Sequence, residues 1–255
     1  MPQLETVKWV KRGKIAQLVL MRPHVLNAVN NQATRDLIRA THEIGKHTDV
    51  RVVIVRGAGR AFSTGIDLKQ LSTNRIGMAY YARWERVLRS FETMEKVVIA
   101  AIKQYCLGGG LQLALACDIR IASRNAIFGL PAVKEGLIPG LAPWRLPRYI
   151  GLGRARRYIL SGDNISADEA LAIGLVDYVQ PTENFDSRVM AMAQYYVKVC
   201  SVAAVQSKLL INQSLNFGYE RFRRSYLRRQ RIARSSRDHY EAKSAYLERR
   251  QPVFA

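Results

Sequence analysis

The chain has 255 residues, of which 48% are hydrophobic and 24% charged, the composition of an ordinary globular protein with one large domain or a domain and an appendage. No apolar run reaches the roughly 18 residues of a membrane-spanning helix, and residues 1–13 lack a secretory signal pattern, so we expect a cytoplasmic protein with no membrane partner. Forty Lys and Arg against twenty Asp and Glu give a formal charge of +20, which favours polyanionic partners.

The first part of the chain alternates between strand and helix patterns. Residues 6–21 alternate in hydrophobicity around Gly13 and predict a β-hairpin. Asn30 or Asn31 is placed to cap a helix that continues to about Lys46. Residues 50–57 form a continuous apolar run, which is typical of a buried strand.

The same alternation continues beyond residue 70. Residues 78–94 predict a helix, 97–102 a buried strand, 111–117 an Ala/Leu-rich buried helix and 119–122 another strand. Ser166 followed by Glu169 is the signature of a capping box, and Gly174 can end that helix. Apart from 176–180, residues from 143 onward are helical in pattern. Such an order favours an α/β fold with parallel or stacked sheets.

The three cysteines, Cys106, Cys117 and Cys200, match no zinc or redox spacing. All three lie in apolar segments, so we expect buried free thiols. We accordingly predict no metal site.

A triple glycine, Gly108-Gly109-Gly110, lies between the buried strand and the buried helix. Glycine permits positive φ and close approach of another segment. A helix that begins there presents unpaired N–H groups and the positive end of its dipole, which suits an oxygen that gains negative charge. A tight turn that packs the helix on the strand is the alternative. The pattern is neither a dinucleotide fingerprint nor a P-loop.

Segments from nearly end to end resemble the crotonase (enoyl-CoA hydratase/isomerase) superfamily. They are Arg22-Pro23 with Leu26-Asn27-Ala28, the loop 58–68, the triple glycine, 117–122 with 128–131, 136–148 and 167–176. The resemblance implies an α/β fold with a crotonase-like ββα spiral core at residues 1–195. It further implies a C-terminal helical region at 196–255 for trimerisation and CoA capping, and self-association as a trimer or hexamer.

The resemblance also implies an acyl-CoA substrate, whose CoA moiety makes a separate cofactor unnecessary. Its thioester carbonyl would lie in an oxyanion hole formed by the N–H groups of Ile66 and Gly109. The other implied substrate-binding residues are His24, Val25, Leu26, Thr64, Asp67, Leu68, Gly108, Ala132 and Trp144. We expect Asp67 to hold its loop, because a carboxylate beside the hole would oppose the developing charge.

The acid/base pair departs from the hydratases, because Gln112 and Ala132 stand where that family normally has glutamates. Hydration needs one group to activate water and another to deliver a proton. Gln112 can hold a water but cannot take its proton, and Ala132 can do neither. Glu135 is a candidate substitute, with a solvated surface charge as the alternative. His239 is another candidate, since some decarboxylating members of the family use a C-terminal histidine. A structural role for His239 is the alternative.

The leading interpretation is a lyase or isomerase of fatty acid metabolism that polarises a CoA thioester and hydrates enoyl-CoA poorly. Decarboxylation or thioester hydrolysis in the same hole is an alternative. A third is a catalytically weak homologue that binds RNA or acyl-CoA. Residues 219–237 hold eight arginines among aromatics, a composition typical of RNA-binding surfaces. We favour a packed helix with a basic solvent face, on which Arg221, Arg224, Arg228 and Arg231 align.

Overall fold

The computed structural model describes residues 4–199 and 201–254, and the strands of this part form two sheets. The main sheet has the order β1-β2-β3-β4-β6-β9. Its first two strands are antiparallel and all later pairs are parallel. Its strands are β1 (Val7–Arg12), β2 (Ile15–Leu20), β3 (Val52–Gly57), β4 (Val97–Ile102), β6 (Ile119–Ser123) and β9 (Tyr178–Gln180).

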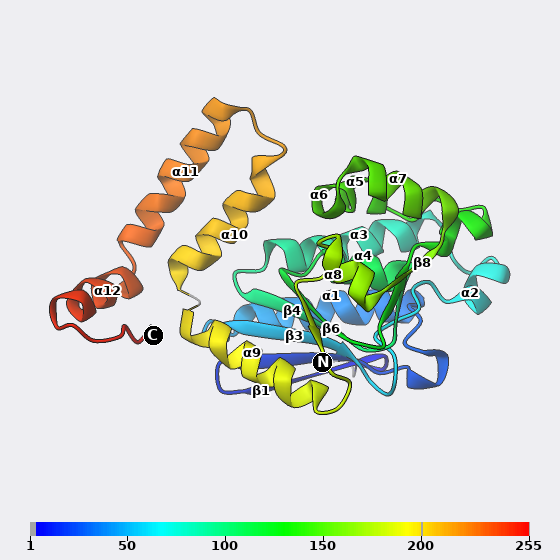
Figure 1. The fold of residues 1–255 in the computed structure, drawn as a ribbon, viewed down its shortest axis with the longest axis horizontal. Coiled ribbons are helices and arrows are strands. Elements are labelled where there is room, and N and C mark those ends of the chain that lie inside the picture. Colours follow the sequence, from blue (N-terminus) through cyan, green and yellow to red (C-terminus); the bar gives the residue numbers. More distant parts are fainter. Residues whose placement is uncertain (1–3, 200, 255) are drawn as a thin grey trace.

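The smaller sheet has the order β5-β7-β8, with β5 (Tyr105–Leu107), β7 (Ile127–Gly129) and β8 (Asn164–Ser166). Short helices connect the strands or cover this sheet (Figure 1). They are η1 (Pro23–Val25), α2 (Leu68–Ser72), α4 (Gly109–Leu115), η2 (Pro131–Glu135), α5 (Ala142–Arg145), α6 (Pro147–Ile150), α7 (Leu152–Ser161) and α8 (Ala167–Ala172).

Side chains of the main sheet alternate between two hydrophobic clusters. Val53 and Val55 face the larger core, which includes residues of α1 (Asn31–Lys46) and α3 (Met78–Thr93). Val52 and Ile54 face the opposite cluster, which α9 (Phe185–Val199) covers. A largely parallel sheet buried on both faces requires such continuous apolar strands.

Several local predictions are confirmed. Gly13 joins β1 to β2 with φ +57°, and Asn30 caps α1 by accepting a hydrogen bond from the N–H of Ala33 at 2.8 Å. Ser166 caps α8 by accepting from the N–H of Glu169 at 3.2 Å. The Glu169 carboxylate, however, accepts a hydrogen bond from the Tyr158 hydroxyl, which gives it a partner outside the predicted capping box.

The glycine-rich helix begins earlier than the sequence predicts. We expected it to start at residue 111, but α4 begins at Gly109 and therefore includes two of the three glycines. Cys106 and Cys117 are buried free thiols, as predicted, and burial raises the pKa of both. Cys200 lies outside the described residues.

Three helices, α10 (Val202–Ser214), α11 (Tyr219–Arg234) and α12 (Arg237–Leu247), extend from one side of the core, and we call residues 202–254 the arm (Figure 1). The Lys208 ammonium holds α10 to the core by pairing with Asp118 at 2.8 Å. Asp238 of α12 pairs with Arg51 at 3.7 Å. The boundary predicted after residue 195 falls within α9, which packs on the main sheet.

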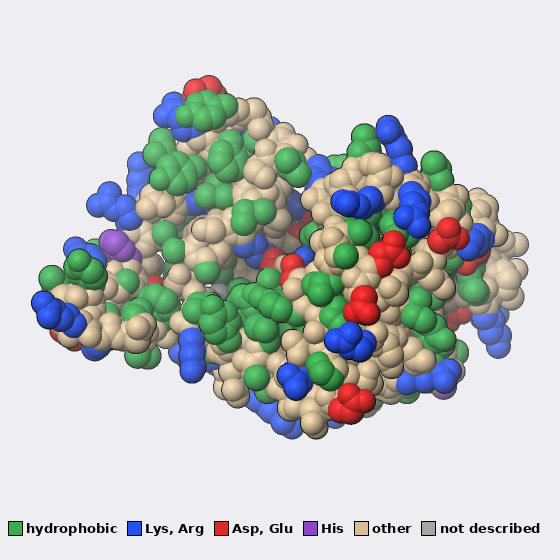
Figure 2. Space-filling model, viewed as in Figure 1, with side chains coloured by type: hydrophobic (Ala, Val, Ile, Leu, Met, Phe, Trp, Pro, Cys, Tyr) green, Lys and Arg blue, Asp and Glu red, His purple; other side chains and the backbone are tan. Residues whose placement is uncertain are grey.

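The arginine-rich helix α11 packs on α10 partly through polar contacts. Ser225 donates to Gln213 at 2.6 Å, and Arg229 donates to Gln206 at 2.7 Å. The four arginines of the predicted basic face are exposed, and Tyr226 of the same helix is 44% exposed. Figure 2 shows hydrophobic side chains gathered on the visible face of the arm. Within the described chain, no helix meets the length and hydropathy of a bilayer span.

Candidate active site

The loop after β3 touches the triple-glycine loop at Gly65 and Gly109. Gly65 has φ +89°, and a Cβ there would lie 2.6 Å from the Gly109 nitrogen and 2.8 Å from the Leu107 carbonyl oxygen. Only glycine tolerates both the conformation and the approach. This contact brings the backbone of Ile66 beside the start of α4.

Pairing with β5 holds the first loop in this position. The Ser63 N–H donates to the Tyr105 carbonyl at 2.9 Å, and the Leu107 N–H donates to the Ser63 carbonyl at 3.0 Å. A Cβ at Gly110 would overlap the Ser63 carbonyl oxygen. The triple glycine is thus required for close approach at residue 110 and for the positive φ of +51° at Gly108. Gly109 itself is less crowded.

The Ile66 N–H points away from the segment with which Ile66 pairs. Ile66 forms an isolated parallel bridge with Val29. The Gly65 carbonyl accepts from the Val29 N–H at 2.6 Å, and the Asp67 N–H donates to the Val29 carbonyl at 3.1 Å. Because these flanking groups form the bridge, the N–H of Ile66 lies on the other side. It donates no hydrogen bond to any described residue.

The Gly109 N–H is also unpaired within residues 4–199 and 201–254. Gly109 is the first residue of α4, where N–H groups have no acceptor within the helix. The neighbouring Gly108 N–H does have a partner, the Gly129 carbonyl at 2.8 Å. Two unpaired N–H groups therefore lie on segments that touch.

Asn27 fixes the first loop from the turn that contains η1. It is 2% exposed, and its amide donates to the carbonyls of Ala58 at 2.9 Å and Ala61 at 2.8 Å. Ser63 Oγ donates to the Asn27 carbonyl at 2.9 Å and accepts from the Gly65 N–H at 3.1 Å. The predicted binding residues His24 and Val25 are exposed on this turn, and Leu26 is half-buried.

The Asp67 side chain is engaged in hydrogen bonds at the end of its loop. Its carboxylate accepts from Arg22 at 2.7 Å and caps α2 by accepting from the Gln70 N–H at 3.1 Å. Burial opposes ionisation of Asp67, but these hydrogen bonds outweigh burial, and its pKa lies below the usual value. A carboxylate engaged in this way is a structural group.

The Gln112 side chain lies against Gly140. Gln112 is 5% exposed, and a Cβ at Gly140, where φ is +48°, would lie 2.5 Å from its Oε1. That oxygen has no hydrogen-bond partner among the described residues. Trp84 of α3 packs on the start of α4, and its Nε1 is likewise buried without a partner there.

The remaining predicted residues occupy varied positions. Thr64, Gly108 and Ala132 are half-buried near the two loops, and Leu68 is 55% exposed. Trp144, on α5, is 41% exposed and lies under the Arg148 guanidinium, 3.3 Å from the ring centroid. It lines a cavity of about 620 Å³ between the core and the arm.

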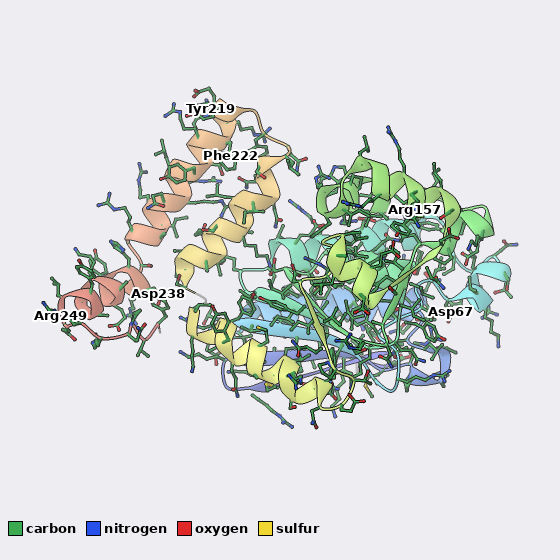
Figure 3. All side chains as sticks on the ribbon, viewed as in Figure 1. Asp67, Arg157, Tyr219, Phe222, Asp238 and Arg249 are labelled. Carbon is green, nitrogen blue, oxygen red and sulfur yellow. The ribbon has the colours of Figure 1, made fainter. Side chains whose placement is uncertain are left out.

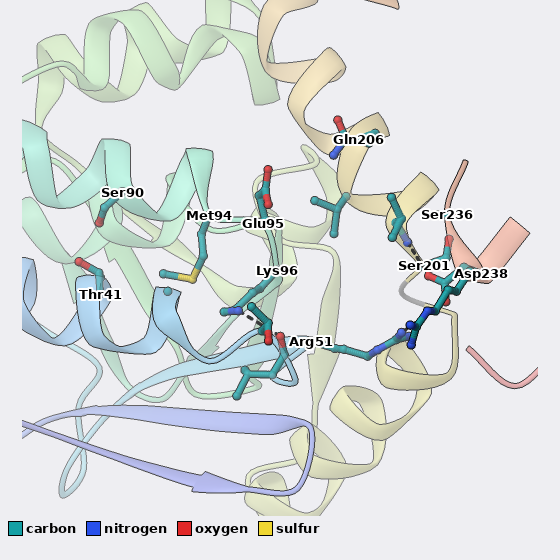
Figure 4. Close-up of a pocket in the computed structure, with 16 residues that line it drawn as sticks. Thr41, Arg51, Ser90, Met94, Glu95, Lys96, Ser201, Gln206, Ser236 and Asp238 are labelled. Atoms are coloured by element: carbon teal, nitrogen blue, oxygen red, sulfur yellow. Dashed lines mark hydrogen bonds and ion pairs between the residues drawn. The ribbon is translucent and has the colours of Figure 1, made fainter. Parts of the chain in front are cut away.

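Neither proposed substitute, Glu135 nor His239, belongs to the two loops that carry the N–H groups of Ile66 and Gly109. Glu135 is exposed at the end of η2. His239 follows Asp238 on α12, and Figure 3 shows Asp238 and Asp67 at opposite ends of the molecule. The cavity that Asp238 lines with Arg51 and Lys96, also of about 620 Å³, lies at the junction with the arm (Figure 4).

Sequence reasoning missed two groups of residues near the site. The helix pattern of residues 78–94 does not reveal that the Trp84 indole N–H is without a partner among the described residues. Arg145 is 4% exposed and pairs with Glu92 at 2.7 Å and Glu85 at 2.9 Å. Glu85 and Glu92 are seven residues apart on one helix and therefore share a face. This spacing was the signal in the sequence from which a shared partner for the two carboxylates could have been predicted. Among the described residues, no cluster of His, Cys, Asp and Glu could hold a metal ion.

The model of the family described as "Enoyl-CoA hydratase/isomerase" matches residues 11–255 of the chain. A "Short-chain-enoyl-CoA hydratase" of Clostridium acetobutylicum is 36% identical over 261 residues, covering 98% of this chain and 97% of the relative. The chain belongs to the enoyl-CoA hydratase/isomerase family. A "Crotonyl-CoA hydratase" of Syntrophomonas wolfei is 33% identical over 254 residues, covering 98% of each protein.

Solved structures of this family confirm the predicted crotonase-like α/β fold. An enoyl-CoA hydratase from Bacillus anthracis superimposes with a TM-score of 0.91 at 28% identity, covering 98% of this chain and 99% of the other. A putative enoyl-CoA hydratase from Streptomyces coelicolor gives a TM-score of 0.93 at 27% identity, covering 100% and 96%. The C-terminal helices are included in these matches.

We predict that Asp67→Asn lowers the free energy of unfolding by about 1–3 kcal/mol at pH 7, because asparagine still caps α2 but loses the charged pair with Arg22. Since folding lowers the pKa of Asp67, its contribution is present above about pH 4 and is lost as pH falls through the folded-state pKa. Urea unfolding between pH 7 and about pH 2 measures this difference, because the contribution disappears only below the usual pKa of aspartate.

The control is Asp163→Asn, which removes an exposed carboxylate 3.8 Å from Lys134 and should change the free energy of unfolding by less than about 0.5 kcal/mol. A constant difference between wild type and Asp67→Asn over the whole pH range would contradict the role assigned to the Arg22 pair.

Proposed function

We propose that the chain binds acyl-CoA thioesters and polarises the thioester carbonyl between the N–H groups of Ile66 and Gly109. The observation that carries this proposal is the meeting of two unpaired N–H groups at the contact of Gly65 with Gly109. Two donors aimed at one oxygen stabilise an enolate-like or tetrahedral transition state, and losing one typically costs about 3–4 kcal/mol.

The family and the substrates named in its members' descriptions support an acyl-CoA substrate. The relatives are described as hydratases of short-chain enoyl-CoA and crotonyl-CoA. The exposed turn with His24 and Val25 adjoins the loop of Ile66 and is our proposed contact for the CoA moiety. No separate cofactor is proposed.

Assembly as a trimer or hexamer belongs to the same proposal. The arm extends away from the core and exposes large hydrophobic side chains, among them Ile211 at 70% and Leu215 at 67%. A second copy of the chain would cover such a surface. The basic face of α11 would then remain a solvent-facing surface.

The reaction we propose is of the hydratase/isomerase type, with little hydration of simple enoyl-CoA. Gln112 and Ala132 supply neither an acid nor a base. Arg145 engages the carboxylates of Glu85 and Glu92, so an ion pair holds them away from proton transfer. No observation favours decarboxylation or thioester hydrolysis over this reaction.

The direct test of carbonyl recognition compares butyryl-CoA with its thioether S-butyl-CoA, in which a CH₂ group replaces the carbonyl. Two hydrogen bonds of about 1 kcal/mol each predict that the thioester binds about 10-fold to 30-fold more tightly by isothermal titration. Equal affinities would contradict the proposed oxyanion hole, and no binding of either compound would contradict the proposed function.

We expect wild-type protein to hydrate crotonyl-CoA at least about 100-fold more slowly than an ordinary hydratase, because a general acid or base usually contributes about 10²–10⁴-fold. Gln112→Glu with Ala132→Glu should increase the rate of loss of enoyl absorbance. Gln112→Asn with Ala132→Ser is the matched control and should give no increase. Wild-type turnover at an ordinary hydratase rate would show that these positions do not determine hydration.

A further inference from the structure

Helix α11 carries a row of four exposed arginines, which we call the arginine ridge. They are Arg221, Arg224, Arg228 and Arg231. Residues three and four apart are neighbours on a helix surface, so the four side chains leave α11 on one side. At 1.5 Å per residue, their Cα atoms span about 15 Å. The arginine ridge is therefore a short, straight line of positive charge.

The carboxylates of the arm do not neutralise the arginine ridge. Residues 202–254 contain twelve Lys and Arg but only four Asp and Glu. Each of these four acids pairs with an arginine outside the ridge: Glu220 with Arg223, Asp238 with Arg51, and both Glu241 and Glu248 with Arg250. The charge of the ridge is therefore available to an external polyanion.

Packing of the arm leaves the arginine ridge accessible. Ser225 and Arg229 face α10 and donate hydrogen bonds to its glutamines. Tyr226 is two residues from both Arg224 and Arg228, so it points to the opposite side of α11 from them. In Figure 2, Lys and Arg side chains project from the outer edge of the arm, beside its hydrophobic face. Assembly through that hydrophobic face would leave the ridge exposed.

The chemistry of the ridge suits a chain of phosphodiester groups. All four residues are arginines, whose planar guanidinium can donate two parallel hydrogen bonds to the oxygens of one phosphate. A linear polymer with regularly spaced phosphates can engage such a row one group after another. Because α11 packs on α10, it cannot enter the groove of a duplex, and only one strand reaches the ridge.

Two aliphatic side chains border the arginine ridge. Leu227 lies three residues from Arg224 and four from Arg231, and Ile232 lies four residues from Arg228, so both are neighbours of the ridge. They are 48% and 45% exposed. The unstacked bases of a single strand can contact such apolar groups, whereas a duplex keeps its bases stacked inside. The ridge itself contains no aromatic side chain on which a base could stack.

A membrane surface suits α11 less well than a nucleic acid does. A helix that lies in the membrane interface inserts its apolar face among the lipids and turns its charged face to water. In α11 the side opposite the arginines is partly occupied by contacts with α10. The side that remains exposed offers a row of charges in place of a broad apolar surface.

We propose that the arginine ridge of α11 binds the phosphate backbone of single-stranded RNA without reading its bases. RNA is favoured over DNA because its strands are commonly unpaired in loops and ends. This function is independent of the proposed thioester chemistry. Figure 3 places Phe222 of α11 and Asp67, beside the thioester site, at opposite ends of the molecule.

The test measures binding of the full chain to a fluorescent 12-nucleotide oligo(U) by anisotropy between 50 and 300 mM salt. We expect a dissociation constant of about 10⁻⁵–10⁻⁶ M at 100 mM salt. Four phosphate contacts predict a slope of about −3 for log affinity against log salt. Arg224→Gln with Arg228→Gln removes two contacts, so the slope should fall to about −1.4 and the affinity by about 10-fold to 30-fold.

Two control variants separate a site from the general charge of the protein. Arg154→Gln with Arg156→Gln removes the same charge from exposed positions on α7, and it should leave the affinity within about threefold and the slope unchanged. Arg224→Lys with Arg228→Lys keeps the charges and should retain a slope near −3. Oligo(A) should bind within about threefold of oligo(U), because the phosphates are the same.

An equal loss of affinity in the α7 and α11 glutamine variants would overturn the proposal, as would a wild-type dissociation constant above about 1 mM at 100 mM salt. A preference of more than about 10-fold for one base sequence, or for a 12-base-pair duplex, would contradict binding to the backbone of one strand. Displacement of oligo(U) by saturating butyryl-CoA would assign the ridge to the CoA moiety instead. Binding to phosphatidylserine vesicles without binding to oligo(U) would assign it to a membrane.

Discussion

The close approach of Gly65 to Gly109 is the constraint on which the proposed site depends. A side chain at residue 65 would collide with the backbone of the second loop, so the two segments can meet only through glycine. Asn27 and Ser63 then hold the first loop by hydrogen bonds to backbone carbonyls, and an ion pair joins the side chains of Arg22 and Asp67. The N–H groups of Ile66 and Gly109 have no partner among the described residues where the loops meet.

This arrangement separates electrostatic stabilisation from proton transfer. Backbone donors depend on the path of the chain and persist whatever side chains surround them. Acid/base groups depend on single residues, and Gln112 and Ala132 supply none. Under the function proposed above, the chain binds and polarises a thioester while its reaction differs from that of its hydratase relatives.

The main elements of the fold could be predicted from the sequence because the relevant signals are local. Continuous apolar runs gave β3 and β4, and the Asn30 cap gave the start of α1. The start of α4 was missed by two residues because glycine is a poor helix former, and contact with Ser63 and Gly65 overrides that propensity. Extension of the arm and its anchoring by Lys208 depend on contacts between distant residues, which no local pattern reveals.

The site was predictable only in part for the same reason. The two glycine-containing loops identify the backbone donors, but the free N–H of Trp84 is visible only once its neighbours are placed. The position of Gln112 against Gly140 likewise joins segments 28 residues apart. His239 illustrates the opposite problem: its residue type suggests chemistry, yet it lies on the arm, away from Ile66 and Gly109 in this chain.

The most direct test of the account is a crystal structure of the full chain with butyryl-CoA. The account predicts that the thioester oxygen lies about 2.7–3.1 Å from the backbone nitrogens of both Ile66 and Gly109. A thioester bound in the cavity between core and arm, or an oxygen beyond hydrogen-bond distance of either nitrogen, would contradict it.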